Sequence, residues 1–357
     1  MDPPALVGRP RSSAASDSIV TVSSDASDWP DYLRRASGAS LFHDPRWGLV
    51  MARAYGNRPF YLTARRDGAP VGLLQLIGQK SLLFGSHLCS LPYFDAAGIL
   101  AGDEPARDAL LSRAEQLMNE LGADWVEIRQ ATPIARSLPT RKDKVALVLD
   151  LPGRSEQLWK LLKAKVRNQI RKAQREGLTA SRGDERLLGE FYPVYARNMR
   201  DLGSPPHAKR FFRLICGQFR RLVRVFVVRS GGRAVAASLT VRDGGTVHVP
   251  WAASDWRLRQ VCPNMLLYWS MLADACDTGA ASFDFDRSTL NSGTYRFKKQ
   301  WGARDLPLYW HYLTRLPGRV PALRPDSPKY RFLAACWRRL PVRLASLLGP
   351  RVISKLH

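Results

Sequence analysis

The alternation of apolar and polar residues predicts several short β-strands. It is clearest in residues 60–76, where two alternating segments flank Arg66-Asp67-Gly68. Because Asp-Gly tolerates the positive φ of a tight turn, these segments predict a hairpin. Further strands are expected at residues 19–22 and 125–128.

A second pattern, with apolar residues three and four positions apart, predicts helices. In residues 104–121 this spacing is formed by Leu110, Leu111, Ala114, Leu117, Met118 and Leu121. Gly122 follows as a helix stop. Two shorter helices are expected, one starting near Pro30, a residue suited to a first turn, and one at residues 45–55.

The order hairpin, strand, helix, strand occurs twice along the chain. In the second half it is formed by residues 225–240, 246–251, 263–277 and 282–286. A repeated order of elements indicates a duplicated unit. The sequence therefore predicts an α/β fold with two tandem mixed sheets, each flanked by helices.

The length of 357 residues suits two domains with additional terminal segments. The predicted divisions are a flexible leader (1–18), an N-terminal domain (19–150), a C-terminal domain (151–315) and a basic amphipathic tail (316–357). The longest uncharged windows, 81–94 and 261–273, are shorter than the ~18 apolar residues that cross a bilayer. If a membrane is involved, the protein is expected to lie on its surface.

The chain has 55 Lys and Arg against 31 Asp and Glu, which gives a formal net charge of +24. Such an excess attracts polyanions, among them phosphate, nucleic acid and acidic membranes. The alternative is an Arg bias that only reflects base composition. The five cysteines show no metal-site or redox spacing, so we expect thiols in a reducing, cytoplasmic compartment. No metal motif, Walker loop or dinucleotide fingerprint occurs, and we expect no metal.

Residues 155–177 concentrate positive charge and predict one helix, beginning at Ser155 and ending at Gly177. Its cations are Lys160, Lys163, Lys165, Arg167, Arg171, Lys172 and Arg175. A solvated helix face normally mixes charges of both signs. This helix is therefore expected to face an anion.

The tail also concentrates positive charge. It predicts two amphipathic helices, residues 329–340 and 342–348, with Gly349-Pro350 ending the second. Asp326 is the one acid from residue 316 onward. The apolar stripe of the first helix either rests in an anionic lipid interface or packs on the body of the protein.

The densest group of polar residues is found at 283–288. Side chains alternate along a strand, so Asp284 and Asp286 share one face while two phenylalanines anchor the other. The acids are expected at the carboxyl end of the strand, where open α/β sheets bind ligands. The alternative is a structural ion pair between one of these acids and a neighbouring arginine.

A turn and a short helix follow in residues 291–302. Tyr295, Lys298 and Lys299 are three or four residues apart or adjacent, which makes them neighbours on this helix. The lysines suit a carboxylate or a pyrophosphate, and Tyr295 suits proton relay. The alternative places Tyr295 and Trp301 in the core.

Two further positions are candidates. Asn264 starts a predicted helix, and the free N–H groups of a helix N-terminus suit an anion. His248, on the preceding strand, is either a catalytic base or a core residue.

Together these segments resemble the FemAB-like proteins of the GNAT acyltransferase superfamily. The resemblance is carried by 283–288 (FDFDRS), 293–302 (GTYRFKKQWG) and 165–173 (KVRNQIRKA), with further matches at 81–92 (SLLFGSHLCSLP), 339–341 (RLP) and 347–350 (LLGP). In particular, the chain looks like the FemAB-related group associated with PEP-CTERM and exosortase systems and the neighbouring CelD-like proteins.

The resemblance implies two tandem GNAT-like domains that transfer an acyl or aminoacyl group to an amine. The implied donor is aminoacyl-tRNA or acyl-CoA, with no bound cofactor. The implied acceptor is an anionic envelope, exopolysaccharide or lipid-linked precursor at the cytoplasmic membrane face. Two departures matter: the group usually has Gly at the position of Asp286, and residues 259–264 replace the Gly-rich pyrophosphate loop, which speaks against acetyl-CoA.

The expected catalytic residues are Asp284, Asp286 and Tyr295. Substrate binding is expected of Arg287, Ser288, Lys298, Lys299, Trp301 and Asn264, and binding of the polyanionic part of the donor is expected of Lys165, Arg167, Asn168 and Arg171. The alternative function is a non-catalytic protein that binds nucleic acid or tRNA on the same scaffold. The tail is the candidate for contact with an anionic membrane surface.

Overall fold

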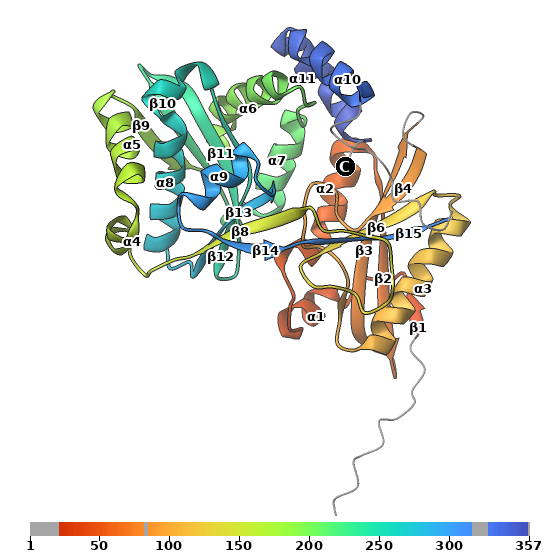
Figure 1. Ribbon diagram of the computed structural model, residues 1–357. Helices are drawn as coiled ribbons and strands as arrows, with labels where there is room; N and C mark the ends of the chain where they lie inside the picture. The colour runs from red at the N-terminus through yellow and green to blue at the C-terminus, as the bar shows by residue number, and fades with distance from the viewer. Residues whose placement is uncertain (1–20, 82–84, 316–327, 356–357) are drawn as a thin grey trace, which may run out of the picture.

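The computed structural model describes residues 21–81, 85–315 and 328–355. Two mixed sheets are each flanked by helices (Figure 1). The expected α/β fold with two tandem mixed sheets is confirmed. The predicted leader (1–18) and the first part of the tail (316–327) lie outside the described residues.

The first sheet has the strand order β1-β2-β3-β4-β6-β15-β7, and β5 pairs with β3. Its strands are β1 (Thr21–Ser23), β2 (Arg58–Arg66), β3 (Ala69–Ser81), β4 (Gly85–Cys89), β5 (Leu100–Ala101), β6 (Trp125–Gln130), β7 (Thr140–Arg141) and β15 (Tyr309–Thr314). Its helices are α1 (Trp29–Arg35), α2 (Arg46–Tyr55) and α3 (Glu104–Glu120). The predicted hairpin is β2–β3, and Asp67 in its turn has a φ of 51°.

The second sheet has the order β14-β8-β13-β12-β11-β10-β9. Its strands are β8 (Lys144–Asp150), β9 (Thr179–Gly183), β10 (Val223–Ser230), β11 (Arg233–Asp243), β12 (Thr246–Ser254), β13 (Ser282–Thr289) and β14 (Arg304–Pro307). The accompanying helices are α4 (Ser155–Leu161), α5 (Ala164–Arg175), α6 (Leu188–Leu202), α7 (Lys209–Gln218), α8 (Pro263–Asp277) and α9 (Gly293–Lys299). Two helices of the tail, α10 (Pro328–Arg339) and α11 (Val342–Ile353), contact α6.

The two sheets repeat the same plan. Starting from β1 and β9, the orders β1-β2-β3-β4-β6-β15-β7 and β9-β10-β11-β12-β13-β8-β14 correspond strand by strand. In each sheet a hairpin leads to a third strand, and a helix then leads to a strand parallel to the third, so that β4 pairs with β6 and β12 with β13. The repeated order of elements expected from the sequence is therefore present.

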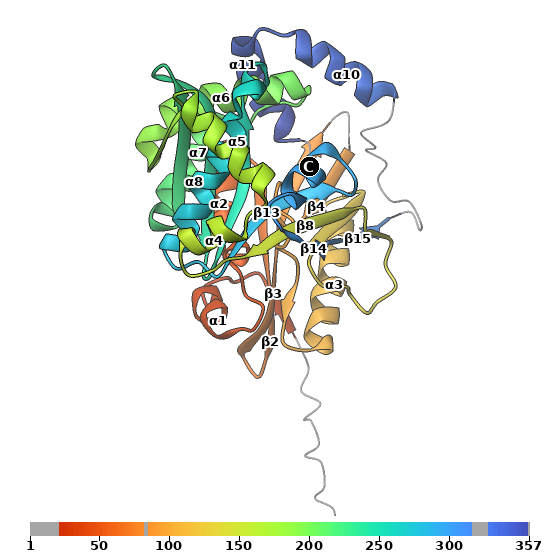
Figure 2. The same cartoon turned by 60° about the vertical axis from the view of Figure 1, so that its left-hand side comes forward.

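Each sheet also contains one strand from the other half of the chain. β8 precedes the predicted division at residue 150 but pairs with β13 and β14, whereas β15 follows β14 and pairs with β6. Residues 140–150 and 304–314 thus form one antiparallel ribbon that crosses from one sheet to the other (Figures 1 and 2). The Leu308 N–H donates to the carbonyl of Lys144 at 3.3 Å where the ribbon crosses.

An apolar core joins the two halves. Trp47 on α2 packs against Phe94 of the first half and against Phe219 of the second, with ring centroids 4.6 and 4.4 Å away. Phe94 in turn meets Trp251 of β12 at 5.7 Å. Because these side chains are buried in one cluster, the two sheets share hydrophobic stabilisation and are fixed relative to each other.

Two local expectations need correction. The basic segment predicted as one helix is two, α4 and α5, because Leu162 and Lys163 are extended with ψ of 142° and 144°. Ser155 does not cap the first helix, since its Oγ and N–H bind Asp277 at 2.8 Å. In the tail, α11 does not end at Gly349 but continues to Ile353, and the missing Cβ of Gly349 lets Pro206 approach closely. Within the described ranges no helix is long and apolar enough to cross a membrane.

The shared core predicts that both halves unfold together. Trp47→Ala should lower the free energy of unfolding by about 3 to 5 kcal/mol, because it empties a fully buried site between them. The unfolding transition, followed by calorimetry and circular dichroism, should stay single. Leu49→Ala on the exposed side of the same helix is the control and should change stability by less than about 0.5 kcal/mol. Two separate transitions in the wild-type protein would contradict the shared core.

Candidate active site

The second sheet opens where its two parallel strands separate. β12 and β13 pair only at three positions, ending with His248 opposite Asp284, although both strands continue. Beyond that point β13 follows β8 through a register shift between Asp284 and Arg287. A cleft of about 490 Å³ lies at this divergence. The cavity therefore borders β13 at the register shift in its middle, and the expectation that the acids end the strand is wrong, because β13 stays paired with β8 as far as Thr289.

The cleft has a polar end and an aromatic wall. The polar end is formed by Asp286, Arg287 and Lys298. The remaining lining is largely apolar or aromatic and includes Tyr93, Tyr195, Met199, His207, Val249, Trp251, Tyr268, Phe285 and Ile353. A largely apolar cavity with a few convergent polar groups is the usual form of a ligand site.

Asp286 occupies a left-handed backbone conformation at the register shift, with a φ of 67°. Its N–H donates to Asp284 Oδ1 at 2.8 Å, and its own Oδ1 accepts from the Arg287 N–H at 2.7 Å. Lys298 Nζ donates to the carbonyls of Asp286 and Arg287 at 2.9 and 2.8 Å. Asp is one of the few residues other than Gly that tolerate this conformation.

The surroundings of Asp286 bring its pKa close to neutrality. Burial raises the pKa of Asp286 to about 7, and the negative charge of Asp95 adds to the rise. Arg287 and Lys298 act in the opposite direction but do not cancel these effects. The carboxyl group of Asp286 can therefore take up and release a proton at physiological pH.

Asp284 connects the shifted strand to His248. Its Oδ2 lies 3.3 Å from His248 Nδ1, and both side chains are mostly buried. Burial opposes protonation of His248, but the hydrogen bond and the negative charge of Asp284 outweigh it and raise the pKa of the imidazole. Phe42 packs edge-on against the ring at 4.9 Å. Neither Asp284 nor His248 lines the cleft, so they support the strand around Asp286.

Arg287 links the site to the first half of the chain. Its Nη1 donates to Asp95 Oδ1 and Oδ2 at 2.9 and 3.1 Å, and Asp95 is buried. The guanidinium also lies over the ring of Trp310 on β15, 5.7 Å from its centroid. The ribbon strand and the buried aspartate therefore hold Arg287 at the edge of the cleft. Asp95 could not be predicted from the sequence, because a single acid in a loop has no diagnostic pattern.

The other predicted site residues lie outside the cleft lining. Tyr295 and Lys299 both turn to Asp305 on β14, with distances of 2.7 Å from the hydroxyl and 3.1 Å from Nζ. Trp301 is buried against Tyr268, and Ser288 is buried on β13. Asn264 lies in the first turn of α8 as expected but is not part of the lining. The structure thus brings together Asp284, Asp286, Arg287 and Lys298 and separates the rest from them.

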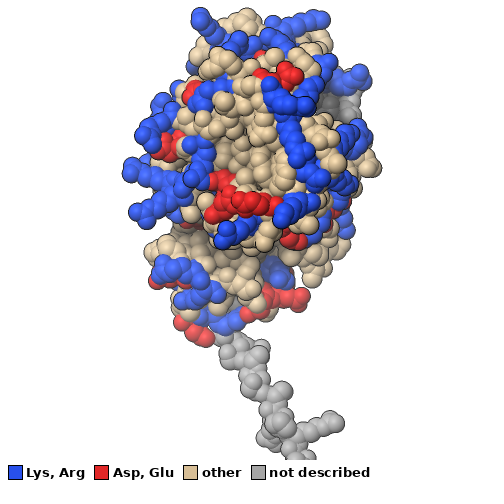
Figure 3. All heavy atoms as spheres, turned by 90° about the vertical axis from the view of Figure 1, so that its left-hand side faces the viewer, with Lys and Arg blue, Asp and Glu red and all other residues tan. Residues whose placement is uncertain are grey.

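The basic residues of α5 form a separate surface. Lys165, Asn168 and Arg171 are exposed, and Arg171 lies over the ring of Trp159 on α4 at 5.4 Å. Arg167 instead donates to the carbonyls of Trp159 and Leu162 and thereby caps α4. A shallow groove of about 570 Å³, formed by Asn168, Arg171, Gln174 and Arg175, is distinct from the cleft. Figure 3 shows that this side of the molecule carries many Lys and Arg around an uncharged area.

Comparison with known proteins defines the class of this fold. Residues 162–299 match the family described as the acetyltransferase (GNAT) domain. The match covers α5 through α9 and therefore includes the diverging strands and most of the cleft lining, although Tyr93 and Ile353 lie outside it. The chain is thus a tandem GNAT-like protein in its fold.

Two solved structures illustrate the likeness. FemX superimposes with a TM-score of 0.61 and 14% identity, covering 79% of this chain and 94% of FemX. L-PGS from Bacillus licheniformis, a lysyl-phosphatidylglycerol synthetase, superimposes with a TM-score of 0.53 and 14% identity, covering 90% of this chain and 98% of L-PGS. No curated protein matches the sequence. At these identities the likeness concerns the fold alone.

The raised pKa of Asp286 predicts a pH-dependent effect on stability. Its folded pKa of about 7 exceeds the ordinary value of 3.8, so its stabilising contribution is complete below pH 3.8 and is lost as pH rises through about 7. Asn also tolerates the left-handed backbone. At about pH 8, the free energy of unfolding of Asp286→Asn, measured with denaturant, should exceed that of the wild type by about 1 to 3 kcal/mol. The gain should vanish near about pH 4, where both side chains are neutral.

The matched control is Asp305→Asn. Hydrogen bonds from Tyr295 and Lys299 outweigh the effect of burial and lower the pKa of Asp305, so this substitution should reduce stability at pH 8. A stability difference between Asp286→Asn and wild type that does not depend on pH would contradict the assigned pKa.

Proposed function

We propose that this protein is an N-acyl or aminoacyl transferase whose general base is Asp286. One observation carries the proposal: a carboxyl group with a pKa near 7 borders an aromatic cleft at the divergence of two parallel strands. A base works best when its pKa lies near the working pH, because it is then both available and strong enough to accept a proton.

The reaction has three steps. The acceptor amine passes a proton to the Asp286 carboxylate and attacks the carbonyl carbon of the donor, forming the C–N bond. The tetrahedral intermediate then expels the leaving group, which is the ribose oxygen of a tRNA or the sulfur of a thioester. The proton held by Asp286 returns to that leaving atom. No oxidant, reductant or metal takes part in this balance.

The groups around Asp286 have distinct tasks. Lys298 is a positioning residue, because its ammonium holds the two backbone carbonyls that fix the carboxylate. Arg287 borders the cleft and is the cation available to an anionic acceptor, while Asp95 orients it. A substrate that covers the aromatic wall displaces water from it, which strengthens these electrostatic interactions. An amine on an anionic envelope, exopolysaccharide or lipid-linked precursor at the cytoplasmic membrane face fits this arrangement.

Aminoacyl-tRNA is the favoured donor. The exposed cations of α5 and their shallow groove suit a polyanion, and they belong to the half of the chain that holds the cleft. The name of the structurally similar L-PGS refers to a lysyl product, which also favours an aminoacyl group. Acyl-CoA is the alternative donor. The segment 259–264 that precedes α8 lacks glycine, which disfavours a pyrophosphate bound through backbone N–H groups.

Loss of the base should abolish most of the activity. Asp286→Asn should lower kcat/KM by about 100-fold or more, the usual contribution of a general base. In the wild type, kcat/KM should rise as pH increases through about 7 and level off above it, because the base must be deprotonated. Asp305→Asn is the control and should leave the pH profile unchanged. A profile without a step near pH 7 would overturn the assignment of the base.

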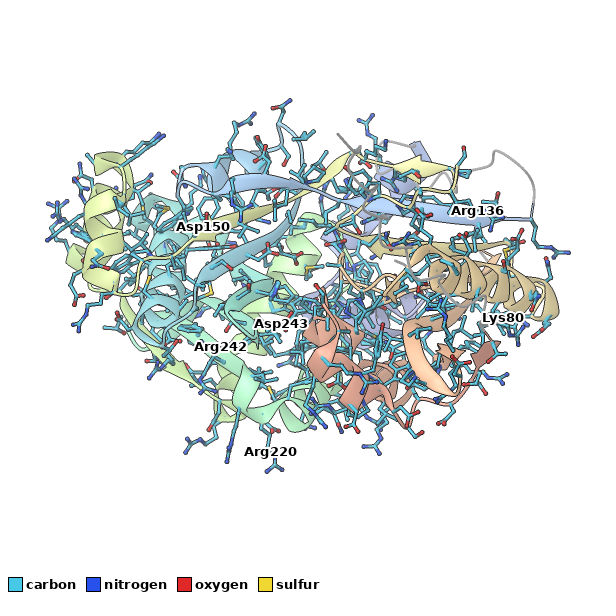
Figure 4. All side chains as sticks on the ribbon, turned by 90° about the horizontal axis from the view of Figure 1, so that it is seen from below. Lys80, Arg136, Asp150, Arg220, Arg242 and Asp243 are labelled. Atoms are coloured by element: carbon cyan, nitrogen blue, oxygen red, sulfur yellow. The ribbon has the colours of Figure 1, made fainter. Side chains whose placement is uncertain are left out.

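The donor can be identified with labelled substrates and variants of α5. The double substitution Lys165→Glu and Arg171→Glu should raise KM for aminoacyl-tRNA by about tenfold and leave kcat unchanged, because it removes contacts with phosphate. Lys80→Glu is the matched control, since Lys80 lies at the opposite end of the molecule from α5 (Figure 4). Transfer from acyl-CoA with no effect of the double substitution would make acyl-CoA the donor.

The same α5 surface favours a second candidate function, a non-catalytic protein that binds tRNA or other nucleic acid. It predicts binding that weakens steeply with salt and that Asp286→Asn does not affect, together with no transfer from either labelled donor. If α5 binds nucleic acid and no group is transferred from either donor, the second function is the correct one.

A further inference from the structure

The two helices of the tail are fixed firmly to the body of the protein. Ala334 of α10 packs on Gly203, where a Cβ would lie 2.8 Å from the Ala334 carbonyl oxygen. At the end of α11, the Tyr93 hydroxyl donates to the carbonyl of Ile353 at 2.8 Å, and the Gln79 side chain donates to that of Ser354 at 3.1 Å. Both helices therefore hold a defined orientation on one side of the molecule (Figures 1 and 2).

The outward sides of these helices are unusually apolar. Large apolar side chains are exposed at Phe332 (68%), Leu333 (47%), Leu344 (46%), Leu347 (65%) and Leu348 (39%). Elsewhere in the described residues such side chains occur singly on different segments, at Leu49, Leu121, Leu161, Leu202, Trp256 and Leu290, whereas the tail helices carry five of them within 17 residues. A cluster of this kind on a folded protein marks a surface for another apolar phase.

Cations accompany the apolar side chains on the same helices. Exposed basic residues are found at Arg331, Arg338, Arg339, Arg343, Arg351 and Lys355. Residues 328–355 contain no Asp or Glu. Exposed leucine and phenylalanine interspersed with arginine suit an interface that is both apolar and anionic.

This surface lies beside the cleft. Pro206 supports Gly349 of α11, and its neighbours Pro205 and His207 line the cleft. Ile353, at the end of α11, lines the cleft itself. A molecule embedded in whatever covers the tail helices is therefore close to Asp286 and Arg287.

We propose that α10 and α11 form a docking surface for an anionic lipid bilayer and place the cleft at the membrane. The role for an acceptor anchored in that bilayer rests on the proposed transferase function, whereas the docking itself does not. A second copy of the chain would bring two equally cationic surfaces together. A nucleic acid would leave the exposed phenylalanine and leucines without an apolar partner. An anionic bilayer satisfies both the charge and the apolar area.

The test is co-sedimentation of the full-length protein with vesicles of phosphatidylcholine, with and without phosphatidylglycerol. The wild type should bind only the vesicles that contain phosphatidylglycerol, and more weakly as salt increases. The double substitution Phe332→Ser and Leu347→Ser, at two exposed positions, should weaken this binding by about tenfold or more. Leu121→Ser, an exposed leucine of the first half, should bind as the wild type does.

Three results would overturn the docking surface. These are equal binding to both kinds of vesicle, no effect of the double substitution, or a wild-type dimer in solution that the double substitution dissociates without any vesicle binding. Arg339→Glu with Arg343→Glu tests the same surface through charge and should also weaken vesicle binding.

The two proposals fail in different ways. Turnover of a water-soluble amine acceptor, measured without vesicles, should persist in the Phe332→Ser and Leu347→Ser variant and be lost in Asp286→Asn. Vesicle binding should be weakened in the Phe332→Ser and Leu347→Ser variant and unchanged in Asp286→Asn. Vesicle binding by a protein without turnover would leave the docking surface standing and remove the transferase.

Discussion

The charges of Asp95, Arg287 and Lys298, which meet at the junction of the two halves, determine the protonation of Asp286. Burial and Asp95 disfavour the Asp286 carboxylate, whereas Arg287 and Lys298 favour it, and Arg287 is held beside it by Asp95 from the first half. Removing Arg287 would leave the buried carboxylate of Asp95 without its partner, which is costly. The pKa of Asp286 is thus a property of the assembled chain, because the carboxylate of one half is tuned by Asp95 of the other.

This balance requires the halves to keep one arrangement. The ribbon of residues 140–150 and 304–314 continues from one sheet into the other, and the core around Trp47 fills the space between them. Hydrogen bonds along the ribbon fix its register, while close packing of aromatic rings resists sliding. Arg287 can therefore meet Asp95 without a mobile hinge between them.

The sequence predicted those features that depend on local patterns. Asp67-Gly68 marked the first hairpin, and the repeated order of elements indicated two sheets. The sheet that β8 or β15 joins could not be predicted, because the alternation of apolar and polar residues within each strand is the same in either sheet. The direction in which each side chain of α9 points could not be predicted either. Lys298 and Lys299 are adjacent, yet Lys298 binds the shifted strand and Lys299 binds Asp305. The break between α4 and α5 has no Gly or Pro to signal it.

Because β8 and β15 each lie in the sheet of the other half, they also limit where the polypeptide can be divided. Severing the polypeptide at residue 150 would leave the second fragment without β8 and the first without β15. Each fragment would then offer a row of unsatisfied N–H and C=O groups, a template for self-association. Two modules with the same strand order are in this way indivisible, and expression of either half alone is a route to aggregates rather than to a working domain.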